Sequence, residues 1–233
     1  MFKRLSANTK GRDYIVGDIH FRTEQLYLGL NALGFDYDND RLITVGDVVD
    51  RGPDVREGLE LFNKPWFHSV QGNHEWMLIE AFRQDPRTPS KGNGAGWWLT
   101  LDKTLQQHLV RTFEQLPIAI EIDSSNGTVG VVHADVPKGI SWGQLTQRLG
   151  RKKMSGTALW SSKRVKTRDP SGVSGAWRVC VGHTTVDAPA RLGNVLALDT
   201  TGGLAGSLAF YCPSTDLIFM DGHPCRILSA ESR

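Results

Sequence analysis

The sequence predicts an α/β domain in which a parallel sheet is accompanied by a second, largely antiparallel sheet. Three observations support this prediction. Short apolar runs alternate with helical segments in the first third of the chain, which is the pattern of βαβ units and a parallel sheet. A hairpin signal and several further short apolar runs follow in the second half. No internal repeat or linker interrupts the 233 residues, so a single domain over residues 1–233 is expected.

The first elements alternate between strand and helix. Apolar runs of strand length occur three times, at residues 14–16, 42–45 and 66–70. Between the first two, leucines at helical spacing predict a crossover helix over residues 23–33. Pro53 starts a second helix, and a third follows the third strand with apolar residues between Met77 and Phe82.

The second half combines one further helix with short strands. Residues 85–96 are rich in Pro, Gly and Ser and predict a loop, and leucines four residues apart predict a helix through residues 101–109. Asn126-Gly127 suits a tight turn, so the apolar runs 118–122 and 128–132 predict a hairpin. Four more strands are predicted at the remaining apolar runs, residues 178–181, 195–198, 207–211 and 217–220.

Composition and charge restrict the class of protein. Hydrophobic residues make up 39% of the chain and charged residues 22%, which allows a full-sized buried core. The formal net charge of +2 is too small to indicate nucleic acid or a membrane surface as a partner. The mostly polar segment 138–176, where no element is predicted, contains two basic stretches at residues 148–153 and 163–168. They are interpreted as solvated surface, with contact to an anionic substrate as the alternative.

Cysteine usage and hydropathy favour a cytoplasmic protein. Cys180, Cys212 and Cys225 are odd in number and lack ligand spacing, and Cys180 lies within an apolar run, as buried free thiols do. This usage is typical of a reducing compartment. The first residues contain no apolar stretch of signal-peptide length, and no run approaches the roughly 18 apolar residues of a membrane span. We therefore expect no membrane segment. The oligomeric state stays open, with a monomer favoured.

Five polar clusters break this ordinary pattern, and most begin where an apolar run stops. They occupy residues 17–20, 46–52, 72–75, 132–135 and 182–184. A strand that ends in a glycine turn places its next polar side chain at the carboxyl edge of the sheet, where ligand sites of open α/β sheets form. Asp, His and Asn dominate these clusters, so we expect them to meet at that edge and to hold a pair of metal ions.

The chemistry of these side chains specifies the kind of site. A carboxylate can bridge two cations because it has two oxygens. A mixture of imidazole and carboxylate suits manganese, iron or zinc, and the absence of cysteine argues against a structural zinc site. Two ions roughly 3.5–4 Å apart would clamp a phosphate and activate a water. Each cluster alone has an ordinary explanation as a turn or a structural histidine, so the prediction depends on their joint occurrence.

The same clusters carry a family resemblance. The sequences GDIHF, GDVVDRG, GNHEW, VVHAD and VGHT resemble the motifs of the phosphoprotein phosphatase family of calcineurin-like metallophosphatases, especially its bacteriophage and bacterial serine/threonine phosphatases. The resemblance covers about residues 14–211 and is weakest over residues 136–175. It implies the fold of that family, a β-sandwich of two mixed sheets flanked by helices.

The resemblance also implies six metal ligands. Asp18 and His20 match ligands of the first ion, and Asp47 matches the bridging carboxylate. The second ion would be completed by Asn73, His133 and His183. The implied cofactors are two divalent ions, with Mn²⁺ expected and Fe or Zn as alternatives.

Further residues match the groups that act on the substrate. His74 matches the general acid that protonates the leaving serine or threonine oxygen, and Asp50 matches the carboxylate that orients it. Arg51 matches a residue that binds two phosphate oxygens through its planar fork. Glu75 is interpreted as a helix-start residue and is left out of the site.

Two positions depart from the family pattern. Phe21 replaces the usual glycine, so we expect a backbone without positive φ there and a ring that narrows the mouth of the site or alters the surroundings of the first ion. Ser162 stands where a second phosphate-binding arginine is expected, and Arg164 is predicted to take its place.

The implied activity is hydrolysis of phosphoserine and phosphothreonine in proteins, with phosphotyrosine as a further candidate. The family pattern implies direct attack of a metal-bridging hydroxide without a phosphoenzyme, and a phosphoprotein or phosphopeptide as partner. One alternative is a diadenosine tetraphosphate (dinucleotide polyphosphate) hydrolase, against which Asp50 argues because that family usually lacks it. A nuclease or phosphodiesterase is disfavoured by the low net charge. A catalytically silent phosphoprotein-binding module is favoured only by Phe21 and Ser162.

Overall fold

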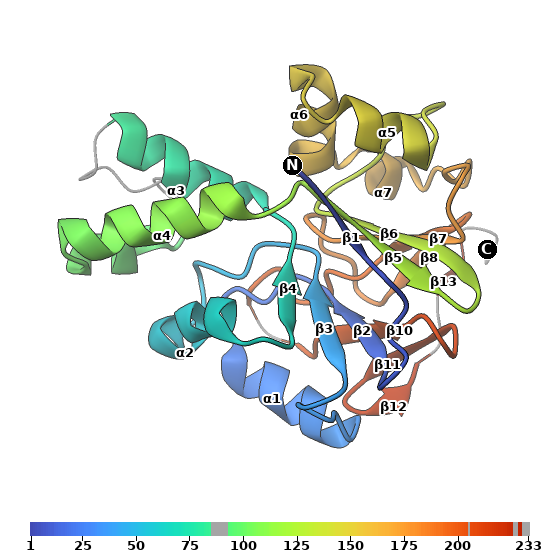
Figure 1. The fold of residues 1–233 in the computed structure, drawn as a ribbon, viewed down its shortest axis with the longest axis horizontal. Helices are drawn as coiled ribbons and strands as arrows, with labels where there is room; N and C mark the ends of the chain where they lie inside the picture. Colours follow the sequence, from blue (N-terminus) through green and yellow to red (C-terminus); the bar gives the residue numbers. More distant parts are fainter. Residues whose placement is uncertain (85–92, 205, 226–227, 230–233) are drawn as a thin grey trace.

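Two β-sheets pack face to face, and helices cover their outer faces (Figure 1). The computed structural model describes residues 1–84, 93–204, 206–225 and 228–229. Both sheets contribute to the apolar core between them, with Ile15 and Ile43 from one sheet and Ile120 and Cys180 from the other. The predicted fold class, α/β with two mixed sheets flanked by helices, is confirmed.

The six-stranded sheet contains the predicted parallel unit, in the order β12-β11-β10-β2-β3-β4. The parallel strands are β2 (Asp13–Val16), β3 (Arg41–Thr44) and β4 (Phe67–Ser69). The antiparallel strands are β10 (Ala209–Cys212), β11 (Leu217–Met220) and β12 (His223–Pro224). Because parallel strands run in one direction, the turns that follow β2, β3 and β4 all lie at one edge.

The seven-stranded sheet has the order β1-β5-β6-β7-β9-β8-β13. Its strands are β1 (Phe2–Leu5), β5 (Ala119–Ser124), β6 (Gly127–Val132), β7 (Arg178–Val181), β8 (Ala190–Leu192), β9 (Val195–Ala197) and β13 (Leu228–Ser229). The predicted hairpin is present as β5 and β6, which pair from Ala119 and Val132 to Ser124 and Gly127. The expectation of a largely antiparallel sheet is wrong, because four of its six pairings are parallel. Long connections allow this, as between β6 and β7.

Helices on one side cover the six-stranded sheet. α1 (Thr23–Ala32) packs on its outer face through Leu26 and Leu30. α2 (Val55–Glu60) continues into the 3₁₀ segment η1 (Leu61–Asn63), whose Leu61 joins the same cluster. Both helices follow the spacing that the sequence predicts.

A second group projects away from the sheets, on the left in Figure 1. It contains α3 (Asn73–Gln84), α4 (Lys103–Gln115) and the 3₁₀ segment η2 (Ala95–Thr100). These elements share their own apolar cluster, in which Trp98 and Phe113 are fully buried. Most of the predicted loop over residues 85–96 lies outside the described residues.

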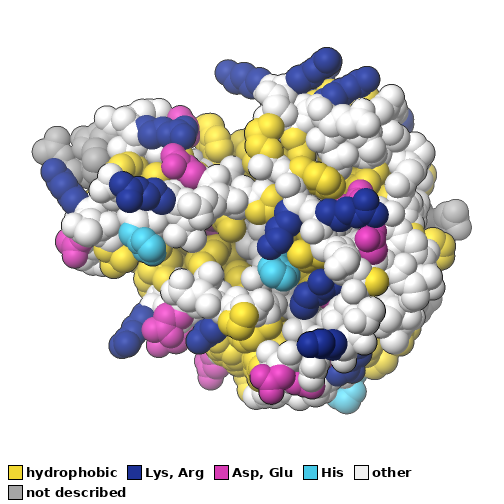
Figure 2. All heavy atoms as spheres, in the orientation of Figure 1, with side chains coloured by type: hydrophobic (Ala, Val, Ile, Leu, Met, Phe, Trp, Pro, Cys, Tyr) yellow, Lys and Arg dark blue, Asp and Glu magenta, His cyan; other side chains and the backbone are white. Residues whose placement is uncertain are grey.

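Three short helices occupy segment 138–176, where the sequence predicts none. They are α5 (Trp142–Arg148), α6 (Lys152–Trp160) and α7 (Lys163–Thr167). α5 begins with a capping box between Ser141 and Gln144, and its Trp142 packs on the seven-stranded sheet. Figure 2 shows Lys and Arg side chains projecting at the top of this group, where residues 151–153 are exposed. Helices this short carry too few apolar positions to show a clear period.

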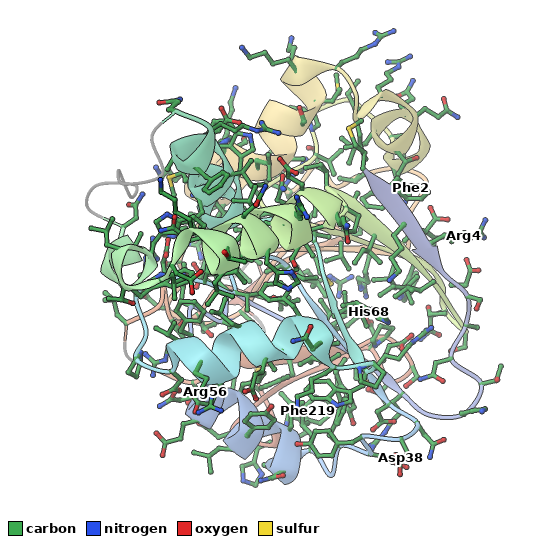
Figure 3. The ribbon with its side chains drawn as sticks, turned by 60° about the vertical axis from the view of Figure 1, so that its left-hand side comes forward. Phe2, Arg4, Asp38, Arg56, His68 and Phe219 are labelled. Carbon is green, nitrogen blue, oxygen red and sulfur yellow. The ribbon has the colours of Figure 1, made fainter. Side chains whose placement is uncertain are left out.

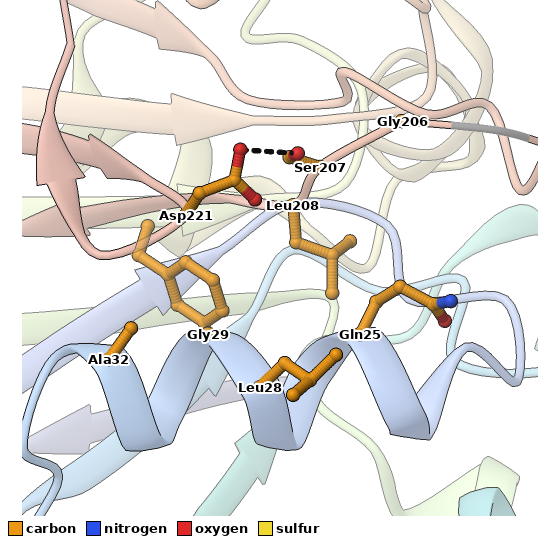
Figure 4. A pocket seen from close by; sticks show the side chains of 9 residues that line it. Gln25, Leu28, Gly29, Ala32, Gly206, Ser207, Leu208 and Asp221 are labelled. Carbon is orange, nitrogen blue, oxygen red and sulfur yellow. Dashed lines mark hydrogen bonds between the residues drawn. The ribbon is translucent and has the colours of Figure 1, made fainter.

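A cavity of about 190 Å³ lies between α1 and β10, lined by apolar side chains such as Leu28 and Leu208 (Figure 4). At its rim Ser207 donates a hydrogen bond of 2.8 Å to Asp221. None of the predicted site residues lines this cavity.

The structure also bears on the predictions made from the cysteines and from the length of the apolar segments. Cys180, Cys212 and Cys225 are free thiols, and the first two are buried. No helix within the described residues has the length and apolar character needed to cross a membrane.

Candidate active site

The predicted metal ligands lie together where the parallel strands of both sheets end. They follow β2, β3, β4, β6 and β7 in turn: Asp18 and His20, then Asp47, Asn73, His133 and His183. Ligand atoms within 4.8 Å of one another form two overlapping groups, one with His20, Asp47 and His74 and one with Asp18, Asp47 and His133. Asp47 belongs to both groups, which is the position of a bridging carboxylate.

Asp47 is buried at the centre of the cluster. Its Oδ2 lies 3.4 Å from His133 Nε2, 3.7 Å from His20 Nε2 and 3.8 Å from His74 Nε2. Its Oδ1 accepts a hydrogen bond of 2.9 Å from the backbone N–H of His74, at the start of α3. One oxygen is therefore fixed by the helix, and the other faces three imidazole rings.

Backbone carbonyls fix the rings of two histidines. His20 Nδ1 lies 2.8 Å from the carbonyl oxygen of Val49, and His133 Nδ1 lies 2.9 Å from that of Val45. Because a carbonyl oxygen only accepts, Nδ1 carries the proton in each ring, and Nε2 presents a lone pair. Histidines that bind metal are oriented in this way.

Asn73 joins the remaining ligands. Its Oδ1 lies 2.7 Å from His133 Nε2 and 2.8 Å from His183 Nδ1. The carboxylate oxygens of Asp18 accept hydrogen bonds of 3.1 and 3.2 Å from the backbone N–H of His183. Both sheets are therefore connected through this polar cluster, since Asp18 follows β2 and His183 follows β7.

The electrostatics of the cluster suit cations. Burial, with the nearby charges of Asp199 and Asp47, raises the pKa of Asp18 well above its usual range. Burial lowers the pKa of His20 to about 3 and that of His183 to about 4, so both imidazoles are neutral near pH 7. The buried Nε2 of His20 has no hydrogen-bond partner among the described residues. Converging lone pairs of neutral imidazoles and carboxylates are the donor set that divalent ions bind. The residues therefore fit the two predicted metal ions.

A second group lies beside this cluster. His74 Nδ1 is 2.7 Å from Asp50 Oδ2, and both side chains are buried. Burial acts to lower the pKa of His74, but the charges of Asp47 and Asp50 outweigh it, and the pKa is raised. Arg51 is exposed, with Nη1 donating to the carbonyl oxygen of Gly202 at 2.6 Å and Nη2 lying 3.0 Å from His74 Nε2. The structure thus brings the predicted acid, its carboxylate and the guanidinium into one group.

Left-handed backbone is concentrated at this site. Nine non-glycine residues in the described ranges have positive φ, and six of them lie at the site or next to it: His20, Phe21, Asp47, Asp50, Arg51 and His183. Each such residue costs on the order of 1–3 kcal/mol. The turns direct consecutive side chains toward one edge, which regular strands cannot do because their side chains alternate between faces.

Glu75 contributes more to the site than a helix-start residue would. Its fully buried carboxylate accepts four backbone hydrogen bonds, from Asp47, Val48, Val49 and Gly72, at 2.8–3.2 Å. Burial and the Asp47 charge raise its pKa, and the N–H donors oppose this rise. Glu75 thereby joins the loop after β3 to the start of α3. In the sequence, the feature that indicates this role is the position of Glu75 directly after His74 in the motif GNHEW.

Asp199 is a further buried residue that the sequence reasoning did not assign to the site. It accepts hydrogen bonds from Thr185 Oγ1 at 3.0 Å and from the backbone N–H of Gly202 at 2.8 Å. Gly202 in turn accepts from Arg51, so Asp199 stabilises the loop that positions the guanidinium. In the sequence, the feature that indicates Asp199 is the one seen in the other clusters: an acidic residue directly follows an apolar run, here that of β9.

Two expectations for Phe21 are wrong, the absence of positive φ and the narrowing of the mouth of the site. Its φ is +53°, so the turn does require left-handed backbone although the residue is not glycine. The ring does not narrow the mouth of the site, because it is fully buried in the cluster of α3, α4 and η2. It packs edge-on against Trp97, with ring centroids 5.0 Å apart, and closely over Gly58, where a Cβ would lie 2.3 Å from its Cδ1.

The prediction for Arg164 is also corrected. Arg164 is buried in α7, and its Nε donates to Asp135 Oδ1 at 2.7 Å. Its other two nitrogens donate to Ser171, Gly172 and Val136. A guanidinium whose three nitrogens are all bonded within the protein is not free to bind a phosphate. It anchors α7 to the loop after β6 instead.

A model of the family described as calcineurin-like phosphoesterase matches residues 13–205. The chain belongs to the calcineurin-like phosphoesterase family. This phosphoesterase is 32% identical over 216 residues to serine/threonine-protein phosphatase 2 of Escherichia coli (strain K12), covering 90% of this chain and 96% of the relative. A shorter match, 35% identical over 80 residues, covers 34% of this chain and 29% of the symmetrical bis(5'-nucleosyl)-tetraphosphatase of Proteus mirabilis (strain HI4320).

Solved structures share the fold of the phosphoesterase. One provisionally named a diadenosine tetraphosphatase has a TM-score of 0.70 at 23% identity, covering 97% of this chain and 98% of that one. The family match and the long relative show that this chain is an enzyme that cleaves phosphate esters. The fold implies a dinuclear site for divalent ions, and the cluster around Asp47 supplies the candidate ligands.

Proposed function

We propose that this phosphoesterase is a metal-dependent phosphomonoesterase that hydrolyses phosphoserine and phosphothreonine in proteins. The Asp50–His74 pair beside the candidate ligands carries the proposal, because a serine oxygen is a poor leaving group that needs an acid. The extended match to a serine/threonine-protein phosphatase supports the same substrate class. Phosphotyrosine is a further candidate substrate. The cytoplasmic location and the monomeric state stay predictions.

The proposed cofactors are two divalent ions, with Mn²⁺ as the expected metal. Six residues would hold them: Asp18, His20, Asp47, Asn73, His133 and His183. When bound, such ions act as Lewis acids toward phosphate oxygens and activate a water. The protein supplies the fixed rings and carboxylates that set their positions.

Arg51 is the proposed phosphate ligand. Its exposed, planar guanidinium can donate two parallel hydrogen bonds to phosphate oxygens. In the structure Nη2 donates to His74 Nε2 at 3.0 Å, so a phosphate that replaces this contact on Arg51 would present its ester oxygen to the same ring. With Arg164 bonded inside the protein, Arg51 is the arginine that we assign to substrate.

His74 is the proposed acid. As a hydroxide oxygen bonds to phosphorus, the bond from phosphorus to the leaving oxygen breaks. The electron pair of that bond passes to the leaving oxygen, which takes the Nε2 proton of His74. Asp50 accepts the Nδ1–H of the ring and so fixes its plane. The carboxylate also favours the charged imidazolium, which is the form that carries the proton to be donated.

Dinucleotide polyphosphate hydrolysis is the second candidate function. The short match to a symmetrical tetraphosphatase supports it, as does an exposed aromatic pair. Trp76 and Trp160 meet edge to face with centroids 5.7 Å apart, and Trp160 lies 6.3 Å from the ring of His183. Such rings offer a surface for an adenine base, and equally for apolar side chains that flank a phosphorylated residue.

The test compares three substrates with Mn²⁺ present: a phosphoserine peptide, p-nitrophenyl phosphate and diadenosine tetraphosphate. We expect the peptide to be cleaved faster than the dinucleotide. Asp47→Asn should abolish turnover of all three. His74→Asn should lower peptide turnover about 10²–10⁴-fold and affect p-nitrophenyl phosphate less, because nitrophenolate leaves without a proton.

Several outcomes would contradict the proposal. Preference for the dinucleotide would favour the second candidate. Full turnover in both variants would remove the assigned site. Binding of Mn²⁺ and phosphopeptide without any phosphate release would indicate the silent binding module.

A further inference from the structure

Trp97 lies where it can control the proposed acid. In η2 its indole Nε1–H donates a hydrogen bond of 2.7 Å to Asp50 Oδ1. The other oxygen of that carboxylate, Oδ2, lies 2.7 Å from His74 Nδ1. Asp50 is fully buried, so its carboxylate is held between an indole and an imidazole, one on each oxygen. A carboxylate fixed at both oxygens cannot rotate about its terminal bond.

The indole is itself held in place. Phe21 and Trp98 pack edge-on against it, with centroids 5.0 and 5.7 Å away. The chain just before it touches the strained turn that carries Asp50, since a Cβ on Gly94 would lie 2.6 Å from the backbone nitrogen of Arg51. The φ of Gly94 is +81°, which also suits glycine. The segment therefore supports the turn through backbone contact and through the indole.

We propose that Trp97 is a positioning residue for the acid His74, acting through Asp50. This inference rests on the proposed function. The imidazole must aim Nε2 at the leaving oxygen when the P–O bond breaks, and Asp50 sets the plane of the ring. Without the indole donor the carboxylate gains rotational freedom, and the fraction of rings in the productive orientation falls. The loss would appear in the step that needs the proton, not in binding.

The chain offers a matched control. Trp142 also donates its indole N–H to a carboxylate, Glu121 Oε2, at the same distance of 2.7 Å. It is fully buried between α5 and the seven-stranded sheet, and it touches none of the proposed site residues in the described contacts. Trp97→Phe and Trp142→Phe therefore remove the same kind of hydrogen bond at two places.

The experiment measures kcat and KM for a phosphoserine peptide and for p-nitrophenyl phosphate in Mn²⁺-loaded protein. Trp97→Phe should lower kcat for the peptide roughly tenfold to a hundredfold, part of the whole acid contribution, with KM unchanged. Turnover of p-nitrophenyl phosphate should stay within about threefold, because its leaving group needs no proton. Trp142→Phe should leave both substrates unaffected.

A double-mutant cycle tests the route through Asp50. If Trp97 acts only by orienting that carboxylate, Trp97→Phe should cause no further loss in an Asp50→Asn background. If Trp97→Phe does not fold, β-(benzothiophen-3-yl)alanine at position 97 keeps the ring and removes only the N–H, with the same kinetics expected.

Two results would overturn the inference: equal losses on both substrates, or additive losses in the cycle. His74→Asn separates this failure from that of the proposed function. If His74→Asn lowers turnover of the peptide more than that of p-nitrophenyl phosphate while Trp97→Phe lowers both equally, only the role of Trp97 is wrong. If His74→Asn also lowers both equally, the proposed acid itself is wrong.

Discussion

Several residues at this site adopt a strained backbone conformation, which determines where their side chains lie. Phe21 is the clearest case, because a bulky residue adopts a φ of +53°, a backbone conformation that favours glycine. Its ring is fully buried and supports Trp97. The burial of a phenyl ring outweighs the cost of the left-handed backbone, since the first is worth about 3–5 kcal/mol on truncation and the second about 1–3 kcal/mol.

The substitution Phe21→Gly tests this balance. We expect it to lower the free energy of unfolding by about 2–4 kcal/mol, because the lost ring contributes more than the relieved strain. Urea unfolding of the metal-free protein measures the change. Phe21→Leu is the control, since it keeps the φ and much of the apolar volume and should cost less. A stability equal to or above that of the wild type in Phe21→Gly would show that strain dominates.

At the scale of elements, two arginines differ in role because one lies on a turn of the site and the other in a buried helix. Arg51 lies exposed on a turn of the site, whereas Arg164 is buried in α7 and paired with Asp135. Removing one partner of a buried pair leaves an uncompensated charge, which costs about 3–5 kcal/mol. Removing the exposed guanidinium of Arg51 loses its contacts with Gly202 and His74 near the surface, so we expect a small change in stability and a larger change in phosphate binding.

The same substitution at both positions separates the two roles. Arg164→Met should lower the free energy of unfolding by about 3–5 kcal/mol and leave the KM of the folded enzyme unchanged. Arg51→Met should change stability by less than about 1 kcal/mol and lower kcat/KM for phosphopeptide about 10–10²-fold, through loss of charge-assisted hydrogen bonds. Thermal unfolding and steady-state kinetics give the comparison. A raised KM in Arg164→Met would restore its predicted role in substrate binding.

The edge strands of the two sheets meet at a titratable contact. Lys3 of β1 places Nζ 3.3 Å from His68 Nδ1 on β4 (Figure 3 labels His68). Burial, with the nearby charges of Lys3 and Arg41, lowers the pKa of His68 to about 4. The unfolded chain therefore binds a proton that the folded chain does not, over the range from about pH 6.5 to about pH 4.

This linkage predicts an acid dependence of stability. The stability associated with neutral His68 is fully present above about pH 6.5 and is lost as the pH falls through about 4. His68→Gln should flatten the curve, with a difference from the wild type of about 1–2 kcal/mol after allowance for partial exposure. Denaturation of both metal-free proteins from pH 7.5 to 4 isolates this residue from the site histidines. Parallel curves would show that His68 does not titrate in this way.

For the whole molecule, the site is also a junction between sheets. The ligand cluster joins the ends of β2, β3 and β4 to those of β6 and β7, and it buries several carboxylates, among them Asp18, Asp47 and Asp199. Without positive charge these groups repel one another across the interface of the two sheets. Bound cations should therefore stabilise the entire fold as well as the site.

Metal removal tests this coupling. Treatment with EDTA should lower Tm, and added Mn²⁺ should restore it. The free energy of unfolding should rise by about 2.7 kcal/mol when free Mn²⁺ reaches about 100 times its Kd. Asp47→Asn should abolish the Mn²⁺-dependent shift, whereas Asp36→Asn, at an exposed carboxylate, should retain it. Calorimetric unfolding with and without Mn²⁺ provides the measurement. A shift that survives in Asp47→Asn would place the ions elsewhere.

The sequence by itself predicted the elements and residues that depend on local rules. A strand-length apolar run followed by Gly-Asp or Gly-His fixes where a polar side chain leaves the sheet, and parallel strands bring such ends together. Asp18, Asp47 and His183 were found in this way, and Asn126-Gly127 gave the hairpin. These signals lie within a few residues of the side chain concerned, so no knowledge of packing was needed.

Only the tertiary structure decided the interactions between distant residues. Trp97 and Asp50 are 47 positions apart, and Arg164 and Asp135 are 29 apart, so no local pattern joins them. The parallel pairings of the seven-stranded sheet and the short helices α5–α7 likewise depend on long connections and on surfaces supplied by other elements. Whether a buried charge pairs inside the protein or faces a substrate is a property of its neighbours in space, and those are set by the fold.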